Sequence, residues 1–296
     1  MLVAVRKAEA GDVNFLVDLY ERAYRGGYSA CFDRHGAIGP QDFWWVQSEK
    51  EVHVVEVNRR PAGMMILGRH GGQLLVEEMI GDLVGTAGRA AALGATDGTL
   101  LRRLHEFVAR RFRQERQDAM LVRTAEVNPL GLAFARVFGF AFTNALIVMT
   151  RALGERVQAP APDGYAVRRA AAGDEREIVR VYQESFGTAL DAGDVQKILH
   201  RPQCRAFVAE RESYRVGFVL AEVRGETGEW ILAVREPHRR RGVGRALAGA
   251  ALEFFRGRKA PRAAVTFWGL DAAAEGFCRR MGYATERVYL YFEKRL

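Results

Sequence analysis

The feature that most restricts this chain is an internal repeat. The segment Ala-Val-Arg-Lys-Ala-Glu-Ala-Gly-Asp, from Ala4 to Asp12, returns as Ala-Val-Arg-Arg-Ala-Ala-Ala-Gly-Asp, from Ala166 to Asp174. Each copy is typical of a short strand, an Asp at a helix start and an amphipathic helix. A repeat this long indicates duplicated domains, since the units of a solenoid are shorter. The 296 residues are enough for two domains.

A second echo lies near the end of each copy, where Arg-Val-Phe-Gly-Phe at 136–140 resembles Arg-Arg-Met-Gly-Tyr at 279–283. The segment between the copies contains Pro and Gly but few large apolar side chains, which is typical of a linker. We therefore predict one domain at 1–153 and another at 163–296, joined by a linker at 154–162.

Strands and helices follow the same order in both copies. Alternating, Val-rich residues at 52–57 and 63–67 predict a hairpin, and residues 206–210 and 216–223 predict its counterpart. A strand, a helix, a strand, a helix and a last strand follow in each copy. This order indicates an α/β layer built on a central sheet.

Composition argues against several classes of protein. The chain is 49% hydrophobic and 27% charged, as expected for a folded protein. It has no apolar run near the roughly 20 residues that a membrane span needs, and charged residues interrupt its beginning where a secretory leader would be apolar. A cytoplasmic protein without a membrane partner is expected. The three cysteines are far apart and the histidines are dispersed, which predicts neither disulfides nor a metal site.

The formal net charge of +8 leaves several partners open. A basic balance can indicate nucleic acid, an acidic partner or a polyphosphate ligand, or only an Arg-rich composition. The arginines between 110 and 116 have only Phe112 among them, without the repeated aromatic residues of a single-strand stacking surface, so nucleic acid is not favoured.

The stretch from Val234 to Arg258 has the pattern of a strand end, a basic turn and a helix start. Gly242 and Gly244 lack a β-carbon, so the backbone there can approach a ligand closely. The first turn of a helix has N–H groups without helical partners and carries partial positive charge, so an anion fits there. The pattern therefore predicts a pocket for a phosphorylated ligand.

The segment Arg-Arg-Arg-Gly-Val-Gly at 239–244 resembles the Arg/Gln-x-x-Gly-x-Gly/Ala motif of the GNAT superfamily of acyl-CoA-dependent N-acetyltransferases. An amphipathic helix follows it, and Gly282-Tyr283 supplies the family's Gly-aromatic ending. The likeness covers nearly the whole chain as two tandem GNAT-like domains. It implies an α/β fold class in which each domain has a mixed, mostly antiparallel sheet flanked by helices. It also implies acetyl-CoA as the cosubstrate and no metal.

The resemblance implies that backbone N–H groups from Arg241 to Ala246 hold the pyrophosphate, and that residues 231–234 pair with the pantetheine arm. Asp271 stands where the family has an Asn, and as an alternative it caps a helix. The predicted cofactor residues are Ile231, Leu232, Ala233, Val234, Arg239, Arg240, Arg241, Gly242, Val243, Gly244, Arg245, Ala246 and Asp271.

The first copy departs from the motif. Gly98 aligns with Gly244, but Leu93 and Thr96 stand where the second copy has an Arg and a Gly. We therefore expect the first copy to have lost or reshaped its CoA site and to have a structural or substrate-shaping role. Trp44 and Trp45, on an expected helix of this copy, either line a substrate cavity or pack in a core.

The catalytic residues are predicted from the reaction. A neutral amine attacks the thioester, and a carboxylate takes its proton. Glu229 is the first candidate for this base and Glu222 the second, although strand-end glutamates are commonly only solvated. Cys278 stands where the family often has a proton-donating Tyr, and it either protonates the leaving thiolate or packs in the core. Tyr289 and Tyr291 are possible substitutes.

The predicted function is transfer of an acetyl group from acetyl-CoA to a primary amine of a small molecule or peptide by direct attack. The expected partners are acetyl-CoA and the amine, in a monomer or homodimer. Two alternatives remain at this point: a non-catalytic acyl-CoA-binding module, and a basic RNA- or nucleoprotein-binding protein.

Overall fold

The computed structural model describes residues 2–25, 39–81, 98–154, 159–188, 190–269 and 271–296, which form two compact units. Unit 1 consists of Met1–Ile147, Trp268–Leu270 and Arg287–Leu296, and unit 2 of Val148–Phe267 and Asp271–Glu286. The units differ from the predicted domains in two ways: residues 148–153 fall in unit 2, and Trp268–Leu270 and Arg287–Leu296 of the second repeat fall in unit 1. Residues 155–158 of the predicted linker lie outside the described part.

Unit 1 is built on a sheet with the strand order β1-β2-β3-β4-β5-β12-β6. The C-terminal strand enters this sheet by antiparallel pairing, with Tyr289 opposite Ala125 and Arg295 opposite Ala119. The elements are β1 (Val3–Lys7), η1 (Ala10–Asp12), α1 (Val13–Arg25), α2 (Pro40–Glu49), β2 (Glu51–Val57), β3 (Arg60–His70), β4 (Gln73–Gly81), α4 (Thr99–Gln114), β5 (Ala119–Ala125), α5 (Pro129–Val137), β6 (Ala141–Ala152) and β12 (Ala284–Arg295).

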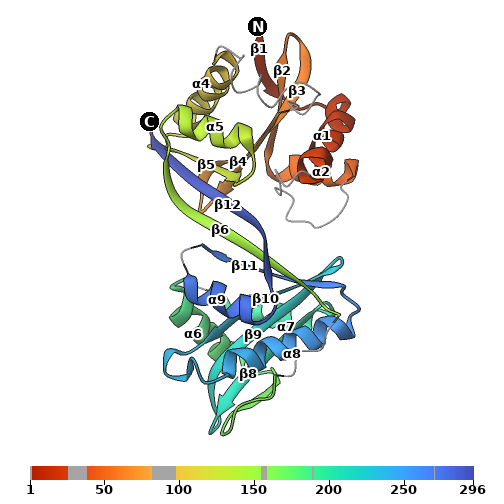
Figure 1. Cartoon of the computed structure of the whole chain (residues 1–296), viewed down its shortest axis with the longest axis vertical. Helices are drawn as coiled ribbons and strands as arrows, with labels where there is room; N and C mark the ends of the chain where they lie inside the picture. Colours follow the sequence, from red (N-terminus) through yellow and green to blue (C-terminus); the bar gives the residue numbers. More distant parts are fainter. Residues whose placement is uncertain (1, 26–38, 82–97, 155–158, 189, 270) are drawn as a thin grey trace. The chain divides into compact units, whose positions relative to one another are not determined.

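Helices cover both faces of this sheet (Figure 1). Along β3, Met64 and Ile66 pack with α1 and α2 in one core. Met65 and Leu67 point the other way and pack with α4 and α5 in a second core. This alternation follows from the pleat of a strand, in which successive side chains point to opposite faces.

Unit 2 has the strand order β11-β10-β9-β8-β7, with residues 148–152 of β6 beside β11. Helices α6 and α7 pack on one face, and α8 packs on the other (Figure 1). The predicted mixed, mostly antiparallel α/β fold is confirmed. The elements are β7 (Ala166–Arg169), α6 (Glu175–Phe186), α7 (Ala192–His200), β8 (Cys204–Arg211), β9 (Tyr214–Arg224), β10 (Thr227–Val234), η2 (Glu236–His238), α8 (Val243–Gly257), β11 (Arg262–Trp268) and α9 (Ala272–Arg280).

The repeated sequence motif forms the same structure in both units. An Arg on the first strand binds the Asp at the helix start, with Nη1–Oδ2 distances of 2.7 Å for Arg6–Asp12 and 2.8 Å for Arg168–Asp174. Each carboxylate also accepts a backbone N–H three residues earlier, at 2.8 and 2.9 Å. The motif therefore recurs because one ion pair ties the first strand to the start of the first helix.

Candidate acyl-CoA site and active site

The parallel strands β10 and β11 are paired at one end and separate at the other. Thr227, Gly228 and Glu229 pair with residues 262–264 of β11. Pairing of β10 with β9 continues to Val234 on its other side. The connection between the parallel strands is the crossover helix α8. The start of α8 therefore lies at the end where the two strands separate.

The turn before α8 has an unusual backbone. Arg240 has φ 60° and Gly242 has φ 88°, values that glycine adopts without the steric penalty of a β-carbon. The first helical hydrogen bond runs from the Ala246 N–H to the Gly242 C=O, at 3.1 Å. The amides of Val243 and Gly244 precede it, so they have no acceptor within the helix. They lie at the positive end of the helix, where an anion is favoured.

The first turn of α8 lies directly against the end of β10. A β-carbon added at Gly244 would be 3.7 Å from Phe277 and 3.8 Å from both Leu232 and Val234. The Arg239 Nε donates to the Val234 carbonyl at 2.8 Å, which fastens the turn to the strand. The structure thus brings together the strand and turn residues that the motif predicts.

The predicted cofactor residues divide by exposure. Buried members can meet a ligand only through backbone groups, whereas the exposed arginines add positive charge beside the amides. The exposed ones are Ile231, Arg239, Arg240, Arg241, Gly242 and Arg245; the buried ones are Ala233, Val234, Val243 and Ala246; Leu232 and Gly244 are intermediate.

Asp271 caps α9. Its Oδ1 accepts the N–H groups of Ala273 at 3.0 Å and Ala274 at 2.9 Å. The capping interpretation is confirmed, and a contact between Asp271 and a cofactor stays a prediction.

The two candidate bases are direct neighbours. Glu222 on β9 and Glu229 on β10 lie opposite each other in the strand register. Arg224 is close to both, with N–O distances of 2.8 Å to Glu222 and 3.6 Å to Glu229. The sequence reading did not single out Arg224. Its position two residues after Glu222 could have identified it, because residues two apart on a strand lie on the same face.

These three side chains line a cavity of about 350 Å³ where β10 and β11 separate. Most of the other lining side chains are apolar, as in ligand pockets generally. They are Ile198, Cys204, Leu220, Ala221, Trp230, Ile231, Ala264, Val265 and Thr266.

Cys278 is buried, with 1% of its surface exposed. Burial, assisted by the charge of Asp271, raises the pKa of its thiol to about 12. Proton transfer from such a thiol to a thiolate of ordinary pKa, about 8.5, is unfavourable. The environment therefore supports packing. Nearby, the Trp230 Nε1 donates to the Tyr283 hydroxyl at 2.8 Å, and burial raises the pKa of Tyr283.

The other aromatic candidates belong to unit 1. Tyr289 and Tyr291 lie on the part of β12 that pairs with β5, so no geometry within unit 2 connects them with α8. Trp44 and Trp45 on α2 are half-exposed instead of buried in a core.

In unit 1, one alignment needs correction. Gly98 precedes α4 with φ 70°, and its carbonyl accepts the Arg102 N–H at 2.9 Å. Gly98 is therefore the counterpart of Gly242, and Leu100 is the counterpart of Gly244. The prediction was wrong by two residues because the connection before α4 differs in length. Leu93 and Thr96 lie outside the described residues.

The strand pair of unit 1 that corresponds to β10 and β11 is closed by side chains. β4 and β5 pair at Val76 and Val122. Beyond that point, the Arg123 Nε donates to the Glu77 carbonyl at 3.3 Å, and the Asn128 Nδ2 donates to the Met79 carbonyl at 2.9 Å. These β4 carbonyls already have partners from the chain itself.

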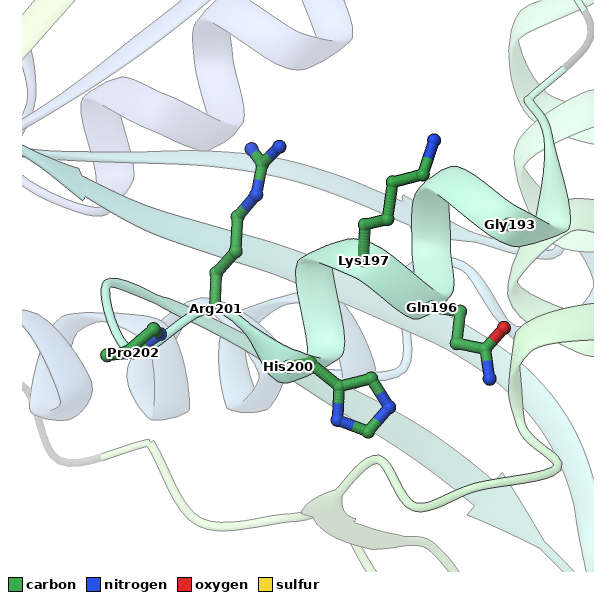
Figure 2. A pocket seen from close by; sticks show the side chains of 6 residues that line it. All are labelled: Gly193, Gln196, Lys197, His200, Arg201 and Pro202. Atoms are coloured by element: carbon green, nitrogen blue, oxygen red, sulfur yellow. The ribbon is translucent and has the colours of Figure 1, made fainter.

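A larger but more open hollow of about 560 Å³ lies along α7, lined by Gly193, Gln196, Lys197, His200, Arg201 and Pro202 (Figure 2). Figure 2 shows Lys197 and Arg201 pointing to one side of the helix, and Gln196 and His200 to the other. Because these side chains do not converge, the hollow lacks the geometry of a reaction site.

Within the described residues, no group of three or more His, Cys, Asp or Glu side chains is suited to hold a metal ion. None of the described helices is both long and apolar enough to cross a membrane.

Comparison with solved structures shows the same fold over nearly the whole chain. A GCN5-related N-acetyltransferase from Sphaerobacter thermophilus superposes with a TM-score of 0.75 at 17% identity, covering 99% of this chain and 95% of that one. A tandem GNAT protein from the clavulanic acid biosynthesis pathway gives 0.67 at 16% identity, covering 99% and 98%. A GCN5-related N-acetyltransferase from Kribbella flavida gives 0.55 at 16% identity, covering 85% and 92%.

No curated protein sequence matches the chain. Residues 175–283, which carry α6 to α9, match the acetyltransferase (GNAT) family. The family match thus falls within the second repeat, and the chain as a whole shares the fold of the tandem GNAT structure.

Proposed function

We propose that this chain is an N-acetyltransferase that uses acetyl-CoA, bound in unit 2, to acetylate a primary amine. The observation that carries the proposal is the coincidence of three features at one end of β10. The strand separates there from β11, the first turn of α8 lies against Leu232 and Val234 at Gly244, and a cavity with two carboxylates opens beside the separating strands.

The residues present fit acetyl-CoA. Amides from Arg241 to Ala246 would bind the pyrophosphate, since helix starts of this kind bind phosphates. The exposed arginines around them would offset its negative charge. The strand edge at 231–234 would pair with the pantetheine arm. Acetyl-CoA would supply an activated acetyl group as a thioester.

Glu229 is the proposed base. In the reaction, the amine nitrogen bonds to the acetyl carbon, the carbon–sulfur bond breaks, and the amine proton goes to a carboxylate directly or through water. Glu229 is the last residue of β10 that pairs with β11, and the two strands separate after it. Cys278, the other predicted catalytic residue, has less support because its thiol is such a weak acid. The departing thiolate would take a proton from solvent.

Calorimetry with acetyl-CoA tests the cofactor site. In Gly242→Glu/Gly244→Glu, two carboxylates stand where the anion would bind, so we expect affinity to fall at least a hundredfold, about 3 kcal/mol. The matched control is Gly98→Glu, which introduces a Glu at the equivalent left-handed position of unit 1. It should bind acetyl-CoA as the wild type does. Unchanged affinity in the double variant would disprove the site.

A second candidate is a non-catalytic acyl-CoA-binding module. The buried, weakly acidic Cys278 in place of the family's Tyr favours it. A thiol-release assay over a panel of primary amines separates the two functions, because the binding module would bind acetyl-CoA without releasing CoA beyond the background rate.

A further inference from the structure

We propose that the Glu222–Arg224 pair determines the charge of the acceptor, so that the cavity takes a small cationic amine without a carboxylate. This rests on the proposed acetyl transfer and adds the class of its acceptor.

The first observation is the arrangement of charge in the cavity. Cys204, Glu222 and Glu229 form one row across three adjacent strands, since Cys204 pairs with Glu222 and Glu222 with Glu229. Burial and the adjacent Glu222 raise the pKa of the Cys204 thiol, so it is neutral near pH 7. Two carboxylates and one guanidinium therefore give the lining a charge of −1.

The second observation is the unequal burial of these groups. The side chain of Arg224 is 63% exposed, while those of Glu222 and Glu229 are 25% and 33% exposed. Arg224 is thus the most exposed of the three charged side chains, and water screens its positive charge. An entering ammonium group can bind Glu229 in place of the weak 3.6 Å contact from Arg224. Arg224 then remains bound to Glu222.

A carboxylate on the acceptor would be disfavoured by the charges of this cavity. Only Arg224 among the lining residues is positively charged, and two of its nitrogens already contact one oxygen of Glu222, at 2.8 and 3.0 Å. A substrate carboxylate would face repulsion from two glutamates and gain a cation that already has a partner.

The third observation is size and polarity. A volume of about 350 Å³ has room for about twelve non-hydrogen atoms, at roughly the 30 Å³ that a water molecule occupies. Trp230, Ile231 and Leu220 offer apolar walls to the body of the acceptor. An alkylamine or arylalkylamine fits this combination.

Rates of thiol release with matched pairs of amines test the proposal. The pairs are 2-phenylethylamine with phenylalanine, and butylamine with 4-aminobutyrate. We expect the wild type to prefer each amine over its carboxylated partner by at least about thirtyfold in kcat/KM. Arg224→Gln removes the cation and should widen this preference. Glu222→Gln should raise the KM of the amine about tenfold with little change in kcat, since it removes binding and not proton transfer.

Two results would overturn the proposal. One is equal or faster turnover of the carboxylated partners, and the other is a Glu222→Gln variant that loses kcat at unchanged KM. Acetyl-CoA affinity and melting temperature of each variant check that the fold and the α8 site are intact. If no amine is acetylated, the transfer proposal fails. Calorimetry of 2-phenylethylamine and phenylalanine binding to wild type and Glu222→Gln then decides the charge selection separately.

Discussion

The two units of this protein share a fold and differ in whether their parallel strand pair is open. Both start the crossover helix with a left-handed glycine, Gly98 or Gly242. Both cap the next helix with an acidic or amide side chain, Asn128 or Asp271. In unit 1, however, the amide of Asn128 also donates to the Met79 carbonyl of β4.

Asp271 has no such amide group, because a carboxylate only accepts hydrogen bonds. Among the described residues of unit 2, no side chain of α9 or β11 donates to a carbonyl of β10. A duplicated unit can thus retain its backbone topology while a few side chains bond the carbonyls of one parallel strand. Asn128, which matches the family's Asn at this position, thus serves in unit 1 both as a helix cap and as a donor to β4.

The largest effect should come from the proposed base. In Glu229→Gln the carboxylate that takes the amine proton is lost, so kcat should fall about 10²- to 10⁴-fold. The affinity for acetyl-CoA should be unchanged. Glu78→Gln, at a buried glutamate of unit 1, is the control and should lower the melting temperature but not kcat. Steady-state kinetics and calorimetry measure both. Equal loss of kcat in the two variants would contradict a single active unit.

A smaller effect, on stability, should distinguish the two repeated ion pairs. Asp174 is bound by Arg168 and also by Arg215, at 2.9 Å, whereas Asp12 forms an ion pair with Arg6 alone among the described residues of unit 1. We expect Asp174→Asn to lower the free energy of unfolding by about 3 kcal/mol and Asp12→Asn by about 2 kcal/mol. Denaturant unfolding measures both, and the reverse order would refute the ranking.

The same pair predicts an acid dependence. The hydrogen bonds from Arg168, Ala171 and Arg215 outweigh burial and lower the pKa of Asp174 from 3.8 to about 2. A lowered folded-state pKa means that this contribution is complete above pH 3.8 and is lost as the pH falls toward 2. Unfolding measured between pH 5 and 2 should therefore show a shallower acid loss in Asp174→Asn than in the wild type.

An exchange of the helix caps tests the closure of unit 1 directly. Asn128→Asp removes the donor to Met79 and places a second carboxylate near the buried Glu78, whose Oε1 is 3.3 Å from the Asn128 Nδ2. We expect a loss of about 2 kcal/mol. The reciprocal Asp271→Asn keeps its cap and should change stability by less than about 0.5 kcal/mol. Thermal unfolding compares the two, and similar losses would mean that Asn128 acts only as a cap.

The smallest effect is expected at Cys278. The corresponding residue of unit 1 is Ala135, because the N–H groups of Phe140 and Tyr283 bond the carbonyls of Ala135 and Cys278, respectively. Cys278→Ala thus installs the residue of unit 1. Because the thiol pKa is about 12, we expect kcat to change less than about twofold, with about 1 kcal/mol of stability lost through packing. A tenfold fall in kcat at unchanged acetyl-CoA affinity would restore Cys278 as the proton donor.

Much of the architecture could be read from local patterns. The predicted hairpins and the strands and helices after them agree with the observed elements to within a few residues, because alternation and helical spacing are properties of short segments. The Gly242 turn was predictable for a similar reason. A glycine between a strand and an apolar helix leaves few conformations for the backbone.

The candidate site was only partly predictable. Spacing along the chain identified Glu222 and Glu229 but not their position opposite each other, which depends on the β9–β10 register. Arg224 becomes a candidate only when that register places it close to both glutamates. The alignment of Gly98 failed because residue counting cannot locate the start of a helix after a connection of different length.

The sequence by itself determined the duplication, the order of strands and helices in each copy, and the one basic glycine turn that retains the motif. These depend on contacts between residues close in the chain. The tertiary structure decided that the C-terminal strand completes the sheet of unit 1 and that Arg123 and Asn128 donate to carbonyls of β4. It also decided that Cys278 is buried, which raises the pKa of its thiol too far for it to act as a proton donor. A strand's pattern shows which faces it buries but not which sheet edge it joins, and burial and partner carbonyls depend on residues far away in the sequence.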